Sequence, residues 1–338
     1  MVFPLSYFFF FSTLLLGMLL AVSSSSWFGV WVGLELNLMS FIPLIANKMN
    51  PYFSEAALKY FLVQALASTL IVMSSALLLL FSTLSYYLIL MALLMKLGAA
   101  PFHFWFPQIM EGLAWLQTII LMTIQKLAPM FLISYLMINS NLTSIVIFSS
   151  VLTALAGALG GLNMMKLRKI MAFSSINHMS WMLIAVSISD TIWLTYFSFY
   201  TLISISVVLL FQSAHLFSLH DITNLNLSNP LFMLTLPLSL LSLGGLPPFS
   251  GFLPKWMMIQ MMLTKGLVVP LLFLLLSSLI TLYFYLRLVT PFVLMMTPTL
   301  SFNMKTSTHV LHSPLLPFIF MFNLLGLMTP LPLIILTI

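Results

Sequence analysis

The sequence of 338 residues contains no cysteine and very few charged residues. Without cysteine the chain cannot form disulfide bonds, thiolate zinc sites, catalytic thiols or cysteine-ligated iron–sulfur clusters. Charged residues make up 5% of the chain, whereas soluble domains carry about 25%. So few charges cannot cover a water-exposed surface, and 62% of the residues are hydrophobic. The composition therefore predicts an all-α polytopic membrane protein.

The chain also lacks the short motifs that bind metals, nucleotides or activated nucleophiles. No Walker loop, nucleophile elbow or strand-borne dinucleotide fingerprint occurs. The glycine-rich stretch GALGGLN (157–163) lies in an apolar segment, where close helix packing is its expected role. His309 and His312 are three residues apart in a polar loop and do not have the spacing of a metal-binding pair. The basic residues are scattered, so we expect no metal, no cofactor in this chain and no nucleic-acid partner.

Long apolar stretches fill most of the sequence. Windows of about 20 apolar residues predict about eleven transmembrane helices in a single transmembrane domain. The predicted spans are 3–22, 27–46, 57–81, 86–106, 115–137, 143–162, 170–188, 192–217, 233–264, 267–289 and 315–337. The ninth is long and is interrupted by GGLPPFSGFLP.

The positive charges of the loops predict the orientation of the chain. If the spans alternate in direction, one side collects Lys48, Lys59, Lys166, Arg168, Lys169 and Lys305, and the other holds little more than Lys265. The positive-inside rule then predicts the N-terminus on the matrix side and the C-terminus on the intermembrane-space side. The KLRK cluster (166–169) is interpreted as a topology anchor that can also contact lipid headgroups. The 26 methionines favour synthesis in mitochondria, and hence the inner membrane.

Four ionisable residues fall deep within the apolar spans: Glu35, Lys96, Lys126 and Lys255. Each costs about 2.5–3.5 kcal/mol at the centre of a membrane helix, so we expect the four to face a shared polar interior. A desolvated lysine exchanges its proton more readily near neutral pH. Glutamate and lysine along a hydrated path therefore predict a proton relay, and the alternative is a set of paired structural charges that fix helix register.

Two histidines also lie within or beside these spans. His103 and His178 (in SSINHMSW) could take part in the relay, because histidine titrates closest to neutral pH. The alternative is that each is a hydrogen-bonded packing residue.

Two proline-containing stretches interrupt apolar spans in a similar way. MKLGAAPFHFWFP (95–107) and LSLGGLPPFSGFLPKW (241–256) both carry Leu-Gly followed by a Pro-Phe pair and a second proline. Pro101 and Pro248, which begin the two Pro-Phe pairs, are 147 residues apart. An interrupted membrane helix exposes backbone groups that need polar partners, so it lines a cavity. Paired interruptions indicate an internal repeat with a transport site between its halves, unless the two are unrelated proline kinks.

Several longer motifs carry a resemblance to a known family. These motifs are WVGLELNLMSFIP, EAALKYFLVQALAS, MKLGAAPFHFWFP, QKLAP, LRKIMAFSSINHMSWM, LSLGGLPPFSGFLPKW and LYFYLRL. In this order they resemble the antiporter-like membrane subunits of mitochondrial NADH:ubiquinone oxidoreductase, respiratory complex I. The resemblance covers most of the chain and fades over the first twenty residues and over about 290–338.

The resemblance implies a fold of two inverted five-helix repeats. The first would occupy about 1–138 and the second about 143–290, followed by a C-terminal helix at about 315–337. It also assigns Glu35, Lys96, Lys126 and Lys255 to a central hydrophilic axis. The implied partners are the other membrane-arm subunits of a hetero-oligomer, together with lipids. The NADH, FMN, iron–sulfur clusters and ubiquinone would belong to the wider complex.

These observations lead to one main functional hypothesis and two alternatives. The main hypothesis is a non-redox membrane subunit that couples quinone reduction to proton translocation. The first alternative is a stand-alone cation/proton antiporter of the same fold, and the second is a structural membrane-arm subunit. A cation site favours several carboxylates, whereas Glu35 is here accompanied by three buried lysines, which favours protons.

Overall fold

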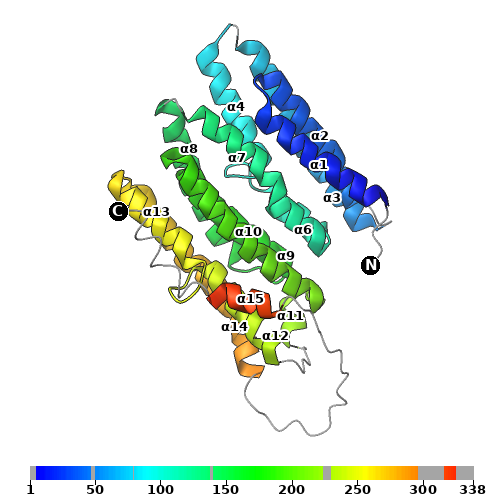
Figure 1. The fold of residues 1–338 in the computed structure, drawn as a ribbon, viewed down its shortest axis with the longest axis vertical. Helices are drawn as coiled ribbons and strands as arrows, with labels where there is room; N and C mark the ends of the chain where they lie inside the picture. The colour runs from blue at the N-terminus through cyan, green and yellow to red at the C-terminus, as the bar shows by residue number, and fades with distance from the viewer. Residues whose placement is uncertain are drawn as a thin grey trace.

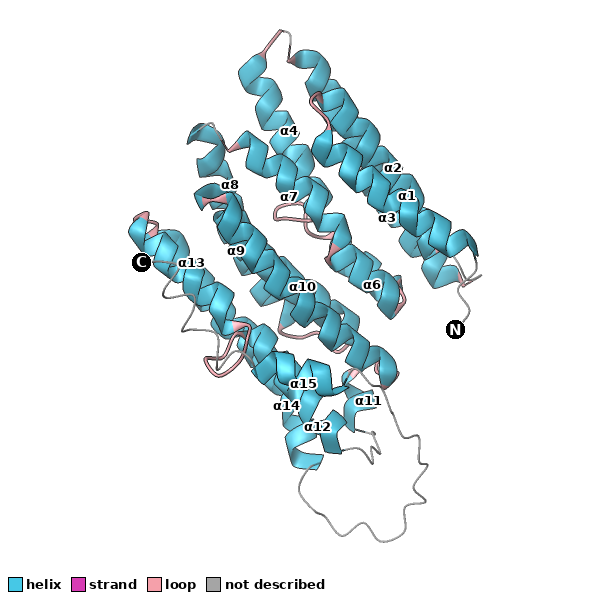
Figure 2. Cartoon of the chain, viewed as in Figure 1, coloured by secondary structure: helices cyan, strands magenta, loops and turns pink. Residues whose placement is uncertain are grey.

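The structure is a computed structural model that describes residues 5–46, 50–78, 80–137, 140–223, 230–295 and 316–324. Every regular element in these ranges is a helix (Figure 2), which confirms the predicted all-α class. The helices are α1 (Leu5–Ser23), α2 (Trp27–Ile45), α3 (Pro51–Leu77), α4 (Ser82–Leu97), α5 (Trp105–Gly112), α6 (Trp115–Met122), α7 (Ile124–Leu136), α8 (Ser140–Gly161), α9 (Leu167–Ile188), α10 (Asp190–Ser213), α11 (Leu219–Thr223), α12 (Pro230–Gly244), α13 (Phe252–Thr264), α14 (Val268–Met295) and α15 (Leu316–Leu324).

The helices lie side by side in one array. Figure 1 shows α1, α2 and α3 at one end of the array and α12, α13 and α14 at the other, with α9 and α10 between them. Almost every residue of α9 is buried, whereas α1 and α14 are largely exposed. Gly157 of α8 allows close packing on α9, because a Cβ there would lie 2.7 Å from the backbone nitrogen of Asn177. The close packing expected for GALGGLN is thus confirmed.

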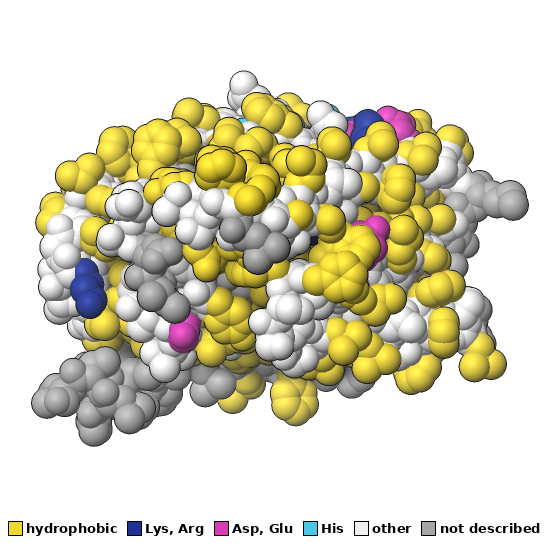
Figure 3. Space-filling view, turned by 90° about the horizontal axis from the view of Figure 1, so that it is seen from above, with side chains coloured by type: hydrophobic (Ala, Val, Ile, Leu, Met, Phe, Trp, Pro, Cys, Tyr) yellow, Lys and Arg dark blue, Asp and Glu magenta, His cyan; other side chains and the backbone are white. Residues whose placement is uncertain are grey.

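The outer surface suits a membrane. Within the described residues, eight helical stretches are long and apolar enough to cross a bilayer, one of which consists of α6 and α7 together. Large hydrophobic side chains such as Phe8, Leu62 and Leu279 are exposed on them, and Figure 3 shows a face covered mainly by hydrophobic side chains with few charges. A multi-pass membrane protein is therefore confirmed, while the count of eleven spans stays a prediction. Residues 296–315, with Lys305, His309 and His312, lie outside the described residues, as do Lys48 and the end of the last predicted span, 325–337.

One span predicted as continuous, 115–137, is divided at Thr123 into α6 and α7. Pro129 lacks an N–H for the carbonyl of Gln125 and its ring crowds that carbonyl, which disturbs the preceding turn. The hydroxyl of Thr123 donates to the carbonyl of Ile119 at the same point, with an Oγ1–O distance of 2.7 Å. Lys126 consequently lies in the first turn of α7.

Both interruptions predicted from the proline-containing stretches are present. The first separates α4 from α5, and the second separates α12 from α13. Each begins at a glycine in the left-handed conformation, Gly98 (φ 72°) and Gly245 (φ 75°), which only glycine adopts without strain. The glycine N–H bonds back three residues and the following N–H bonds back five, which is the Schellman ending of a helix. The inverted relation of the two halves, and their bounds, stay predictions.

Candidate functional site

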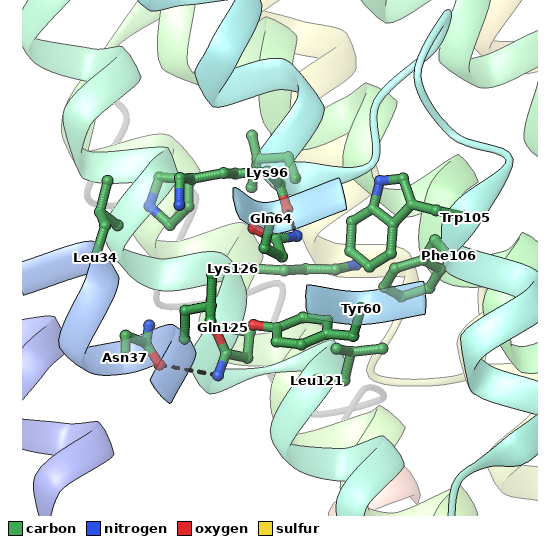
Figure 4. Close-up of a pocket in the computed structure, with 13 residues that line it drawn as sticks. Leu34, Asn37, Tyr60, Gln64, Lys96, Trp105, Phe106, Leu121, Gln125 and Lys126 are labelled. Atoms are coloured by element: carbon green, nitrogen blue, oxygen red, sulfur yellow. Dashed lines mark hydrogen bonds between the residues drawn. The ribbon is translucent and has the colours of Figure 1, made fainter. Parts of the chain in front are cut away.

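Lys96 and Lys126 line one cavity between α2, α3, α4, α5 and α7 (Figure 4). Both lysines are buried, with 7% and 2% of their surface exposed. The space open to the centre of a water molecule in this cavity is about 20 Å³. That is enough to hold one water molecule. Asn37, Gln64 and Gln125 line it together with the lysines. The two lysines expected to share a polar interior are therefore brought together.

The first helix break explains why Lys96 is tolerated there. Lys96 lies in the last turn of α4, where the free carbonyl groups favour a positive charge. Two side chains occupy carbonyls of this turn: Gln64 Nε2 donates to Lys96 O (3.3 Å), and Trp105 Nε1 donates to Met95 O (3.1 Å). The end of α4 is thus held by α3 and by the first residue of α5.

A hydrogen-bonded side-chain network forms another part of the cavity wall. Gln125 Nε2 donates to Asn37 Oδ1 (2.9 Å), and the Tyr60 hydroxyl donates to Gln125 Oε1 (3.3 Å). These bonds join α2, α7 and α3 beside Lys126. Since each residue can also bond to water, the network can orient water next to the lysines.

Glu35 is near this cavity but does not line it. It is half-buried on α2, one residue from Leu34 of the cavity wall. Figure 4 shows the side chain of Lys96 extending toward Leu34, and Glu35 is close enough for its charge to act on Lys96 and on Tyr60. The ion pairs found among the described residues do not include Glu35, and its Oε2 is buried there without a hydrogen-bond partner.

Lys126 points away from Glu35, toward α9 and α10. Its Nζ donates to Ser175 O (3.3 Å) and lies 3.5 Å from the Tyr200 hydroxyl. It also lies 5.2 Å from the ring centroids of Phe106 and of Tyr200, at which range aromatic rings attract a cation. Figure 4 shows this side chain extending toward Phe106. Lys126 therefore connects the cavity to the centre of the array.

His178 lies on α9 between Lys126 and Lys255. Its Nδ1 is 3.0 Å from the Tyr196 hydroxyl, and its ring lies beside Leu243 of α12. The charges of both lysines act on the imidazole. His178 and Tyr200 share the wall of a second cavity of about 10 Å³. Of the two histidines considered from the sequence, this one lies among the buried lysines.

Lys255 lies on α13 after the second break and folds back onto it. Its Nζ donates to Gly244 O (2.8 Å), the last carbonyl of α12, and the residue is 6% exposed. Gly245 makes room for this arrangement, because a Cβ there would lie 2.8 Å from the Cδ of Lys255. The ammonium group thus sits at the carbonyl end of a half-helix, where a positive charge is favoured.

His103 is not part of the lysine cavity. It lies between α4 and α5 and is half-buried, with its ring centroid 4.1 Å from that of Phe104. It lines a different cavity, open at the surface, together with Lys169 and Phe173. Its participation in proton transfer stays a prediction.

The polar residues that accompany the lysines were not identified from the sequence. Tyr60 and Gln64 are four residues apart on α3, so they share one helix face, and Gln125 is next to Lys126. Tyr200 is one of several hydroxyl-bearing residues of α10, among them Tyr196, Ser198 and Thr201, so the sequence alone does not single it out. The spacing on α3 was a usable signal, whereas the contact of Tyr200 with Lys126 depends on how α7 and α10 pack.

A separate charged cluster lies at one end of the array, outside the long spans. Glu111 pairs with Lys166 and with Lys169 (2.6 Å for the latter), and Arg168 donates to the carbonyl of Leu113. Burial raises the pKa of Glu111, but the hydrogen bonds and charges of the two lysines outweigh it and hold the pKa below its usual 4.5. The KLRK cluster therefore joins the start of α9 to the end of α5.

The arrangement can hold and pass protons but offers no metal site in the described residues. No group of three or more His, Asp or Glu side chains suitable for a metal ion occurs there. Hydroxyl, amide and imidazole groups, which can exchange protons, lie near the buried lysines instead. Glu35, Lys96, Lys126, His178 and Lys255 follow one another across the array in that order.

Comparisons with known proteins support a common ancestry over most of the chain. Residues 24–281 match a family model described as "NADH:quinone oxidoreductase/Mrp antiporter, TM". The chain is 49% identical over 284 residues to a protein of Anopheles gambiae named NADH-ubiquinone oxidoreductase chain 2, covering 81% of this chain and 82% of the relative. It is 38% identical over 333 residues to the protein of the same name from Loxodonta africana, covering 94% and 95%.

Two solved structures share the fold. A chain of respiratory complex I from Thermus thermophilus superimposes with a TM-score of 0.81 at 23% identity, covering 97% of this chain and 79% of that one. A chain of the Mrp complex from a Dietzia species gives a TM-score of 0.74 at 20% identity, covering 82% and 59%. At these identities the likeness concerns the fold alone.

Proposed function

The chain belongs to the family of NADH-ubiquinone oxidoreductase chain 2, an antiporter-like membrane subunit of respiratory complex I, and from this premise we propose that it moves protons through its row of buried ionisable groups. The proposed route runs from Glu35 through Lys96, Lys126 and His178 to Lys255. Proton movement along it is coupled to quinone reduction elsewhere in the complex. The chain itself carries no redox centre.

The observation that carries this proposal is the position of Lys126. It shares a cavity with Lys96 on one side and contacts Ser175 and Tyr200 on the other. His178 then lies within electrostatic range of both Lys126 and Lys255. A charge in a membrane span costs several kcal/mol on insertion, and a row of such groups with small cavities between them supports transfer more than it supports stability.

The family also supports a place for the chain. We propose that it is assembled with the other membrane-arm subunits of a hetero-oligomeric complex in the mitochondrial inner membrane. The N-terminus would face the matrix and the C-terminus the intermembrane space, as the loop charges predict. Without cysteine the chain supplies no iron–sulfur ligands, so the NADH, FMN, clusters and ubiquinone of the complex would be bound by its partners.

The antiporter alternative rests on the likeness to the Mrp complex, which shows a common fold. A cation path needs oxygen ligands, whereas Glu35 is the one carboxylate near the buried lysines among the described residues. The structural alternative predicts that neutralising a lysine changes assembly and nothing else. Both alternatives therefore make different predictions for the same experiment.

The test is the substitution Lys126→Met in the assembled complex, with Lys265→Met as the matched control. Lys265 is exposed at the end of α13, away from the proposed route. We expect Lys126→Met to lower proton pumping and coupled NADH:quinone turnover by about tenfold, because acid–base groups supply at least that factor. NADH oxidation by an artificial acceptor should not change. Unchanged pumping in an assembled Lys126→Met complex would refute the proposal.

A further inference from the structure

The last turn of α12 is held by side chains from three other helices. Lys255 of α13 donates to Gly244 O (2.8 Å), and the imidazole of His178 of α9 lies beside Leu243 in the wall of one cavity. Immediately before them, Ser242 Oγ lies 3.0 Å from Asn323 Oδ1 of α15. Three consecutive residues of α12 are therefore contacted by His178 and Lys255, which belong to the proposed proton route, and by Asn323, which does not.

Asn323 also contacts the chain on the other side of the second break. Ser250 N donates to the backbone carbonyl of Asn323 (3.2 Å). Asn323 is fully buried and Ser250 is 2% exposed. Since Ser242 lies in the last turn of α12 and Ser250 precedes α13, α15 contacts both sides of the break.

The hydrogen bonding around Asn323 is incomplete among the described residues. Asn323 Nδ2 and Ser250 Oγ are buried and have no hydrogen-bond partner among the described residues. Ser242 Oγ has two acceptors, Ser239 O (2.7 Å) and Asn323 Oδ1 (3.0 Å), but a hydroxyl carries one proton. Buried groups left unpaired cost free energy and call for an explanation such as a functional role. The cluster has more than one hydrogen-bond arrangement available.

We propose that Asn323 is a positioning residue for proton transfer between His178 and Lys255. Its amide fixes Ser242, and through that turn it sets where Leu243 and the carbonyl of Gly244 lie. These two in turn orient the imidazole and the ammonium group. This inference deepens the proposed function and rests on it.

The first break supports this reading by contrast. There Lys96 O, two residues before the glycine, accepts from Gln64 of α3. The corresponding residue of the second break, Leu243, lies beside the imidazole of His178. Because His178 is itself a member of the route, the second break needs another residue to fix the turn, and Asn323 occupies that place.

The experiment compares Asn323→Leu with Phe318→Leu, both on α15, in the assembled complex. Leucine has the same branching and number of side-chain heavy atoms as asparagine but forms no hydrogen bonds, and Phe318 is 76% exposed. We expect Asn323→Leu to lower coupled turnover and proton pumping by about tenfold, the effect of one lost hydrogen bond on an equilibrium between two arrangements. Artificial-acceptor oxidation of NADH and the Phe318→Leu complex should be unchanged.

The double variant Asn323→Leu/Lys255→Met separates positioning from a structural role. If Asn323 acts through Lys255, adding Asn323→Leu to Lys255→Met should produce no further loss of pumping. If the double variant instead lowers pumping by the product of the two single effects, the inference is overturned. Normal pumping in Asn323→Leu would also overturn it. Should Asn323→Leu fail to assemble, Ser242→Ala removes the same contact without changing α15, and normal pumping there overturns it equally.

The same set distinguishes this inference from the proposed function. Normal pumping in Lys255→Met removes the route through Lys255, and the inference fails with it. Reduced pumping in Lys255→Met together with normal pumping in Asn323→Leu leaves the route intact and removes Asn323 alone.

Discussion

The two helix breaks have the same backbone ending but use it differently. Both start at a left-handed glycine, and the same N–H groups bond back to the preceding turn at positions 147 residues apart. At the first break Lys96 precedes the glycine, whereas at the second Lys255 follows it and folds back to Gly244 O. Both lysines nonetheless belong to the carbonyl end of a half-helix. The comparison teaches that the carbonyl end of a half-helix favours a buried lysine, and that this lysine can come from the helix before the break or from the helix after it.

The largest expected difference between the breaks comes from removing their lysines. Lys255→Met should leave the complex assembled and lower coupled NADH:quinone turnover by about tenfold or more, because no neighbouring side chain can replace the ammonium group at Gly244 O. Lys96→Met should have a smaller effect, since Lys126 lines the same cavity. Proton pumping per NADH oxidised is the measurement, with Lys265→Met as the control. Equal losses in both variants would contradict this ranking.

The next difference concerns the two glycines. A Cβ at Gly245 would lie 2.8–2.9 Å from the Lys255 side chain, whereas at Gly98 it would meet Phe106 and Trp105 at 3.3 Å. Alanine in the left-handed conformation costs about 1–2 kcal/mol at either position. We expect Gly245→Ala also to displace the ammonium group and so to lower turnover per assembled complex by about fivefold, while Gly98→Ala lowers mainly the amount assembled. Turnover normalised to complex content checks this, and equal normalised values would argue against the role of Gly245.

The sequence predicted the two breaks and the burial of the lysines for good physical reasons. Gly-Pro patterns and charges within apolar runs are local signals, and they located Gly98, Gly245 and Lys126 without knowledge of the packing. The division of α6 from α7 had a local signal too, in Pro129, but its effect on the preceding turn was not anticipated.

The rest of the site depends on contacts between distant parts of the chain. Asn323 is 81 residues from Ser242, and Lys126 is 74 residues from Tyr200. Nothing in the composition or periodicity of these segments brings them together. His103 is the converse case, because a histidine close in sequence to Lys96 lines a different cavity, while its participation in the relay stays a prediction.

A smaller effect is expected from the carbonyl that precedes each glycine by two residues. Gln64→Leu removes the donor to Lys96 O and leaves that buried carbonyl unpaired, which costs about 1–3 kcal/mol of stability. At the second break His178→Leu removes the imidazole beside Leu243 and with it a member of the proposed route. Both variants should lower the midpoint of thermal inactivation, but only His178→Leu should lower pumping strongly. A strong pumping defect in Gln64→Leu would show that the first break carries protons through its own backbone end.

The smallest expected effect tests how the half-helix after each break is anchored. Glu111 near the end of α5 pairs with Lys166 and Lys169 of the α9 end, whereas Lys265 at the end of α13 is exposed. Glu111→Gln should therefore destabilise the complex slightly, by about 0.5 kcal/mol, as is usual for partly exposed ion pairs. The pKa of Glu111 is lowered below 4.5 in the folded chain, so its stabilising contribution is present above that pH and is lost as the pH falls through the folded value. At pH 7 the midpoint of thermal inactivation of the Glu111→Gln complex should be slightly below that of the unchanged complex, and the difference should narrow toward pH 4. Glu55→Gln, at an exposed position on α3, is the control. A shift that grows in acid would mean that Glu111 is not held as the paired carboxylate, and the anchoring of α5 would then rest on the bond from Arg168 to Leu113 O alone.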